Sequence, residues 1–196
     1  MLAALALTTA ALPLHAQIRD IPMPNRNWAA AWAGMYTGVD FIFDPGTDSG
    51  WYFDDPAFAF GVGLERELSQ GLLIGVEGSY AATDFERRAD NALLASGDAN
   101  LVTALATGRL ISGSGGPISF YLKGGIGAFG YKVPDPDETN FDFALSSGAG
   151  VQYRLRPTLA ALFEWNQYWA YHEKEGLSTS NTGRHSMLRL GVRAGF

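Results

Sequence analysis

Apolar and polar residues alternate along most of this chain, and this alternation constrains the fold more than any other feature. It is clearest at the C-terminus, where one face carries Leu188, Leu190, Val192, Ala194 and Phe196 and the other carries Arg189, Gly191, Arg193 and Gly195. A period of two residues is typical of a β-strand whose two faces meet different surroundings. The sequence therefore predicts an all-β protein.

Eight segments follow this alternation. They lie near 33–43, 57–68, 72–85, 99–111, 118–131, 141–155, 158–171 and 184–196. No apolar run after residue 31 reaches the roughly 20 residues that a membrane-spanning helix needs. An even number of strands allows an antiparallel sheet to close on itself, so we expect a barrel.

The connections between these segments alternate in length. Long polar connections are expected at 44–56, 86–98, 132–140 and 172–183, and short ones at 69–71, 112–117 and 156–157. Long loops at one end and tight turns at the other are typical of barrels in the bacterial outer membrane.

Alternation alone does not determine which face points inward. A soluble lipocalin-like barrel would turn its apolar residues toward an internal pocket. Here the polar face carries charges of both signs and many glycines. Aromatic residues gather near segment ends, as in the girdles at membrane interfaces: Tyr36, Phe41, Phe43, Trp165, Trp169, Tyr171 and Phe196. We therefore expect an eight-stranded antiparallel transmembrane up-and-down β-barrel in the outer membrane of a Gram-negative bacterium.

The N-terminal region has the pattern of a secretory signal peptide. Residues 2–14 carry no charge, and a small residue, Ala16, follows as a cleavage site. We expect residues 1–16 to be removed, residues 17–31 to form a short periplasmic lead-in, and residues 32–196 to form the barrel.

Composition excludes several classes of function. The chain has no cysteine, which excludes disulfides, thiolate zinc sites, cysteine nucleophiles and a cysteine-linked lipid anchor. Its 14 Lys and Arg residues against 20 Asp and Glu residues give a net charge of −6. This acidic balance argues against a nucleic-acid partner, because nucleic-acid binding needs a basic surface.

With the polar face inside, eight ionisable side chains are predicted to point into the lumen. They are Asp40, Glu65, Glu77, Arg109, Lys123, Glu164, Arg189 and Arg193. Side chains fill the interior of an eight-stranded barrel, and an unpaired charge there would cost several kcal/mol. We expect a charge network that plugs the lumen, with a narrow gated pore as the alternative. The inward list can slip by one residue in 57–68 and 99–111, where Glu67, Leu101 and Leu105 fit the alternation poorly.

Several short stretches resemble the OmpA-type eight-stranded outer-membrane barrel and its porin-opacity-like relatives. They are Trp32 to Asp40, Gly124 to Gly127, Gly150 to Tyr153, Phe163 to Trp165 and Leu190 to Phe196. The resemblance implies an interior salt-bridge network, with Glu77, Lys123 and Glu164 at inward charged positions. It also implies that Phe196, as a terminal aromatic residue, is part of the signal read by the outer-membrane assembly machinery.

Catalytic and metal-binding patterns are weak. His172 and His185 are interpreted as rim side chains that face solvent, since neither has the serine spacing of lipid A deacylases. Asp135, Asp137 and Glu138 lack the ligand spacing of a calcium loop. We therefore expect no enzyme, no cofactor and no metal site, and a lipid A-modifying enzyme remains the less favoured alternative.

The function expected from these features is structural and interactive. The barrel would contribute to envelope integrity as a monomer among outer-membrane lipids and lipopolysaccharide. Its long loops would meet an extracellular ligand or host surface, with Trp51, Tyr52 and Phe53 as the expected contact.

Overall fold

The computed structural model describes residues 27–37, 42–44, 49–53, 56–89, 92–112, 116–134, 137–172 and 181–196. The strands in these residues are β1 (Asn27–Thr37), β2 (Ile42–Asp44), β3 (Ser49–Phe53), β4 (Ala57–Ser69), β5 (Leu72–Ala89), β6 (Ala92–Ser112), β7 (Ile118–Pro134), β8 (Asp137–Arg156), β9 (Leu159–His172) and β10 (Asn181–Gly195). Among them, no helix has the length and apolar character needed to cross a bilayer.

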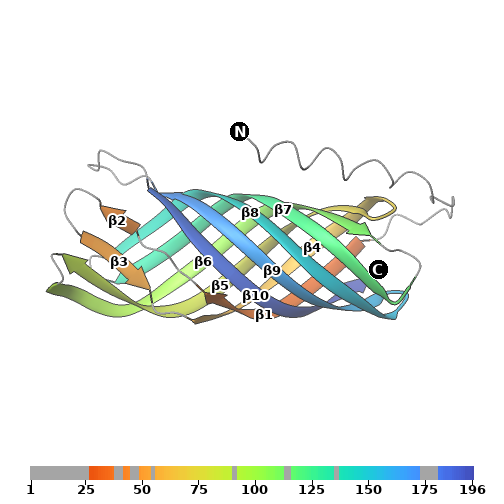
Figure 1. Ribbon diagram of the computed structural model, residues 1–196, viewed down its shortest axis with the longest axis horizontal. Helices are drawn as coiled ribbons and strands as arrows, with labels where there is room; N and C mark the ends of the chain where they lie inside the picture. Colours follow the sequence, from red (N-terminus) through yellow and green to blue (C-terminus); the bar gives the residue numbers. More distant parts are fainter. Residues whose placement is uncertain are drawn as a thin grey trace, which may run out of the picture.

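Eight of the described strands form a closed antiparallel ring, which confirms the predicted fold. The order around the ring is β1, β4, β5, β6, β7, β8, β9 and β10, and β10 pairs again with β1 (Figure 1). Backbone hydrogen bonds in both directions join Asn27 and Phe196, with N···O distances of 3.2 and 2.9 Å. The closure therefore extends to the last residue of the chain.

The two faces of the wall differ as predicted. Outward positions carry large apolar side chains such as Leu122, Leu190 and Phe120, which are more than half exposed. The register that was uncertain in the sequence is resolved, because Glu65 and Arg109 are both buried inside the barrel. Leu101 and Leu105 also point inward, where they belong to an apolar layer that the sequence did not predict.

Short turns connect the strands at the end where the C-terminus lies. Two residues form the turn between β4 and β5, Gln70 and Gly71, and two form the turn between β8 and β9. Gly71 has φ of 80°, in the left-handed region that glycine adopts without strain. A Cβ atom there would lie 2.7 Å from the carbonyl oxygen of Ile111, so this turn requires glycine.

At the opposite end, two of the predicted loops are mostly strand. β5 and β6 remain paired as far as Ala89 and Ala92, and β7 and β8 as far as Pro134 and Asp137. The prediction of polar connections at 86–98 and 132–140 was therefore wrong. Strand pairing needs only backbone groups, so a hairpin that continues beyond the membrane loses its apolar pattern and keeps its hydrogen bonds.

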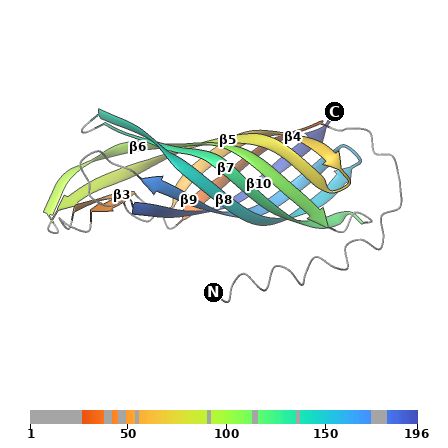
Figure 2. The ribbon, with the colours of Figure 1, turned by 90° about the horizontal axis from the view of Figure 1, so that it is seen from above.

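The first long connection also contains strands. β2 pairs with β3, and β3 pairs with the far end of β5. Figures 1 and 2 both show this small sheet at the end of the molecule away from the C-terminus. The barrel thus continues into a four-stranded sheet in the order β2, β3, β5, β6.

The first barrel strand starts earlier than predicted. β1 begins at Asn27, so the expected boundary between residues 31 and 32 and the first segment 33–43 were wrong. Trp28 and Trp32 point inward while Ala29, Ala31 and Ala33 point outward, which is the reverse of the pattern used to find strands. Tyr36 lies inside the barrel for the same reason, 1% exposed, and is not part of an interfacial girdle.

Candidate functional site: the lumen charge network

Seven of the predicted lumen charges lie in the described residues and all seven point into the barrel. Glu65, Glu77, Arg109, Lys123, Glu164, Arg189 and Arg193 come from β4, β5, β6, β7, β9 and β10, and each side chain is at most 8% exposed. Asp40 lies outside the described residues. Inward positions on different strands meet at the axis because the lumen of a barrel of this size is narrow.

Glu164 lies at the centre of the charge network. Lys123 Nζ donates to its Oε1 at 2.8 Å, and Arg189 Nη2 donates to the same oxygen. The hydroxyl of Tyr121 donates to Oε2 at 2.8 Å, and Arg109 Nη2 lies 3.5 Å from that oxygen. One carboxylate from β9 is therefore bound to three basic side chains from β6, β7 and β10.

Glu77 makes a second bridge across the lumen. Lys123 Nζ lies 2.9 and 2.7 Å from its two carboxylate oxygens, and Arg189 Nη2 lies 3.0 Å from Oε2. Lys123 and Arg189 therefore contact both Glu77 and Glu164. The paired charges link opposite walls of the barrel, as buried charges require to offset their loss of hydration.

Glu65 extends the network toward the end with the short turns. Arg109 Nε donates to its Oε1 at 2.8 Å, and Arg193 Nη1 lies 3.7 Å from Oε2. Arg193 also donates to Gln152 Oε1 at 3.2 Å. The network is thus continuous from Arg193 through Glu65 and Arg109 to Glu164.

Each arginine of the network lies over an aromatic ring. The guanidinium carbons of Arg109, Arg189 and Arg193 are 4.2, 4.3 and 4.1 Å from the ring centroids of Tyr121, Trp32 and Trp28. Cation–π contacts of this kind stabilise a buried cation without a further carboxylate. They also explain why both tryptophans of β1 point inward.

An apolar and aromatic layer lies inside the barrel beyond the charge network. It contains Tyr36, Phe85, Leu101, Leu105, Phe129, Tyr131, Tyr168 and Met187. The ring of Tyr36 packs at 5.8 Å from that of Tyr168 and edge-on at 6.5 Å from that of Phe129. Its hydroxyl bonds to Ser79 Oγ at 3.1 Å. Sequence reasoning missed this layer because it searched the inward face for charges.

His185 belongs to this layer, which corrects its expected place at the rim. Its side chain is 2% exposed and its ring stacks on Phe129 with centroids 4.6 Å apart. Alternation along β10 puts it on the same face as Arg189 and Arg193, and that signal was present in the sequence. The backbone of His172 pairs with that of Asn181 at the end of β9.

A small cavity lies beside the charge network in the described part of the barrel. The cavity bounded by Trp32, Glu65, Glu77, Arg109 and Arg189 measures about 10 Å³. A single water molecule needs at least this much room. In the described part of the chain, no three His, Asp or Glu side chains group as a metal site would require.

The other predicted contact residues lie at the two ends. Trp51, Tyr52 and Phe53 form part of β3, where their backbones pair with Arg87, Glu86 and Phe85. Phe196 lies at the opposite end and is 73% exposed. The structure thus separates the expected surface contact from the expected assembly signal by the length of the barrel (Figure 1).

Comparisons with known proteins point to one family. A family model described as an outer membrane protein beta-barrel domain matches residues 2–196. Neisserial surface protein A (NspA) is 15% identical over 87% of this chain and 97% of its own, with a TM-score of 0.64. Ail of Yersinia pestis, solved with the heparin analogue sucrose octasulfate, is 19% identical over 89% of this chain and 100% of its own, with a TM-score of 0.52. OprG of Pseudomonas aeruginosa is 13% identical over 88% and 95%, with a TM-score of 0.50. No curated protein matches the sequence.

Proposed function

Because the chain belongs to the outer membrane protein β-barrel family, we propose that it is a sealed scaffold that presents a sheet outside the cell. It lies in the outer membrane of a Gram-negative bacterium, where its apolar wall contacts lipids and lipopolysaccharide. The proposal has two parts: the lumen does not conduct, and the extracellular sheet makes the contacts that serve the cell.

The near absence of free volume beside the charge network carries the first part. A cavity of about 10 Å³ beside Glu77 has room for about one water molecule, which supports a lumen without a continuous water-filled path at this level. The apolar layer around Tyr36, Phe129 and Tyr168 supports a second seal in series with the first. A path for ions would have to open both layers, and the charges of the first layer are held by ion pairs on several strands.

Planar bilayer recording tests whether the lumen conducts. We expect the wild-type protein to give no single-channel steps, with insertion verified by the heat-dependent shift of the recovered protein on a gel. The double variant Glu77→Ala and Glu164→Ala should remain closed while the aromatic layer is intact, and adding Phe129→Ala and Tyr168→Ala should open it. Regular steps from the wild-type protein would favour the narrow pore and overturn the sealed scaffold.

The sheet beyond the barrel supports the second part of the proposal. Residues 92–99 of β6 pair with β5, and among the described residues no strand pairs with their other edge. Leu93 and Leu94 in this segment are each 57% exposed. An open strand edge with apolar side chains is suited to contact with another protein. Ail, which shares the fold, binds a sulfated glycan analogue in its solved complex, so a glycan is a second ligand class to test.

Adhesion assays test which part of this sheet makes contact. Cells that express the protein are measured for binding to cultured epithelial cells and to heparin beads. We expect Trp51→Ser, Tyr52→Ser and Phe53→Ser together to reduce binding by about tenfold, as for aromatic residues that dominate an interface. The double variant Leu93→Ser and Leu94→Ser makes the corresponding change on the open edge of β6 and is measured in the same assays. Unchanged binding in both variants would contradict the proposal that the sheet is the contact surface.

We further propose that the protein is not an enzyme. A catalytic histidine must reach its substrate, whereas His185 is buried and stacked on Phe129. Mass spectrometry of lipid A from cells with and without the protein should give identical spectra. Loss or gain of an acyl chain would overturn this part and favour a lipid A-modifying enzyme.

A further inference from the structure

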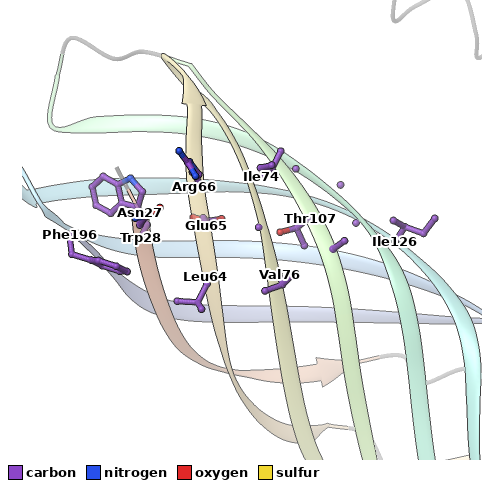
Figure 3. Close-up of a pocket in the computed structure, with 15 residues that line it drawn as sticks. Asn27, Trp28, Leu64, Glu65, Arg66, Ile74, Val76, Thr107, Ile126 and Phe196 are labelled. Carbon is purple, nitrogen blue, oxygen red and sulfur yellow. The ribbon is translucent and has the colours of Figure 1, made fainter. Parts of the chain in front are cut away.

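The outer wall of the barrel contains a hollow that neither the sealed lumen nor the extracellular sheet explains. Its volume is about 870 Å³, within the range of roughly 300–1,000 Å³ typical of small-molecule sites. Figure 3 shows the residues that line it, with Arg66 and Ile74 side by side on β4 and β5 and with Leu64 and Val76 below them.

Strand register places this hollow on the lipid face. Leu64, Val76, Ala106 and Ile126 form one outward row across β4 to β7, and Asn27, Arg66, Ile74, Gly108 and Gly124 form the next outward row. The inward row between them contributes its backbone to the floor, as at Gly75 and Gly125. The apolar side chains of both outward rows are about half exposed.

Two glycines create the depth of the hollow. A Cβ atom at Gly108 would meet no atom within 4 Å, and one at Gly124 would meet only the Ser146 carbonyl oxygen at 3.8 Å. Many other outward positions on the wall carry large side chains, such as Phe163 and Leu190. The bilayer surrounds this face, and an empty hollow would lose dispersion contacts, so a membrane component must fill it.

A cation marks one end of the hollow. Arg66 is exposed on the outward face, and within the described ranges it has neither an ion pair nor a side-chain hydrogen bond. An arginine on the lipid face is costly unless it reaches headgroup phosphates. Arg66 lies three residues before the end of β4, beside the short turn that faces the periplasm. Asn27, its neighbour on β1, adds an exposed amide.

We propose that the hollow binds one glycerophospholipid of the periplasmic leaflet. Its phosphate lies against Arg66 and Asn27, and one acyl chain runs past Ile74 over Gly108 and Gly124. Gly124 is six residues into β7, deeper in the membrane than Arg66, so the groove runs from the headgroup level toward the bilayer centre. The cation at one end and the apolar floor match the two parts of a phospholipid.

Native mass spectrometry tests the proposal with the full-length folded protein. The protein is mixed with dipalmitoyl phosphatidylglycerol in detergent. The detergent is then removed in the mass spectrometer, and the lipids that remain bound to each protein are counted. We expect the wild-type protein to retain one lipid. Gly108→Leu should lower the lipid-bound fraction about tenfold, because the acyl chain loses the contacts of a few methylene groups. Arg66→Ala should lower this fraction less. The controls are Ala149→Leu, which introduces the same side chain on the outer face of β8, and Arg154→Ala, which removes an exposed arginine near the same end.

Equal retention by wild type, Gly108→Leu and Ala149→Leu would overturn the proposal. A dimer in wild type that becomes a monomer in Gly108→Leu would assign the hollow to a second copy and also overturn it. Displacement of the lipid by inorganic phosphate alone would contradict a role for the acyl groove. Folding of each variant is verified by the heat-dependent gel shift, so a lost lipid is not mistaken for a lost fold.

Discussion

Glu164 has more polar contacts than the other carboxylates of the lumen. Its oxygens accept hydrogen bonds from Lys123, Arg189, Tyr121 and Asn166, and its side chain is 1% exposed. Removing this carboxylate would leave three buried cations with too little compensating charge. The energy of such a network therefore depends on its completeness and not on any single pair.

Glu164→Ala should therefore lower the free energy of unfolding by about 3–5 kcal/mol, the usual loss when one partner of a buried pair is removed. Urea unfolding in lipid vesicles, followed by tryptophan fluorescence, measures it. Glu86→Ala is the control, because the Glu86–Arg88 pair is 38% and 46% exposed and such pairs contribute about 0–1 kcal/mol. A loss below that of the control would mean that the lumen network is not stabilising.

Glycine positions on the two faces should respond in opposite ways to the same substitution. A Cβ atom at Gly150 would overlap the ring of Tyr121 and lie 2.7 Å from the carbonyl oxygen of Phe163, whereas one at Gly108 would meet nothing. Gly150→Ala should destabilise by about 1–3 kcal/mol through overpacking and displacement of Tyr121 from Glu164. Gly108→Ala should be neutral or slightly stabilising. The same urea assay compares them, and equal effects would contradict the inward placement of Gly150.

At the residue scale, the sequence predicted which side chains face inward better than it predicted which of them contact one another. Glu77, Lys123 and Arg189 could be assigned to the lumen from alternation alone. His185 and Tyr36 were assigned wrongly, to a rim and to a girdle, and both lie inside the barrel. The position of His185 in the alternation of β10 put it inside, whereas Tyr36 was missed because β1 turns its large aromatic side chains inward.

At the scale of elements, the longest strands are those that leave the membrane. β5 has 18 residues and β6 has 21, although about 9–11 residues span a bilayer. The remainder forms the hairpin that pairs with β3. Membrane-spanning parts were predictable because one face must be apolar. The extracellular parts were not, since both of their faces meet water and the alternation is lost.

Trimming this hairpin should leave the barrel intact. Replacing residues 87–95 by a two-residue Asn-Gly turn joins Glu86 to Ser96, which are paired in the sheet. We expect unchanged folding, judged by the heat-dependent gel shift, together with increased proteolysis of residues 49–53, because β3 loses part of its partner strand. Failure of the trimmed protein to fold would show that the extracellular sheet is required for barrel closure.

At the scale of the whole molecule, closure depends on the two ends of the chain. β1 pairs with β10 from Trp28–Gly195 to Thr37–Ser186, and Phe196 exchanges backbone hydrogen bonds with Asn27. Closure removes every strand edge within the membrane, where unpaired backbone groups are costly. We propose that the barrel is a monomer and that its assembly machinery recognises the C-terminal strand with its exposed Phe196.

Phe196→Ser separates assembly from stability. Since the side chain is 73% exposed and its backbone pairing survives the change, refolding into detergent should be unaffected. In cells, the folded band in the outer-membrane fraction should fall several-fold. Leu190→Ser, an exposed position on the same strand, is the control for lost apolar surface. Normal assembly of Phe196→Ser would contradict its role as a recognition signal.

The sequence by itself determined that this chain forms an antiparallel barrel with a charged interior and an apolar outer wall. The alternation of each strand is visible in its own sequence, so no knowledge of the neighbouring strands was needed. Only the tertiary structure decided which charges meet, because Glu77 and Arg189 are 112 residues apart and become partners through closure. The aromatic layer inside the barrel and the outer hollow likewise depend on register between strands, which alternation along one strand does not encode.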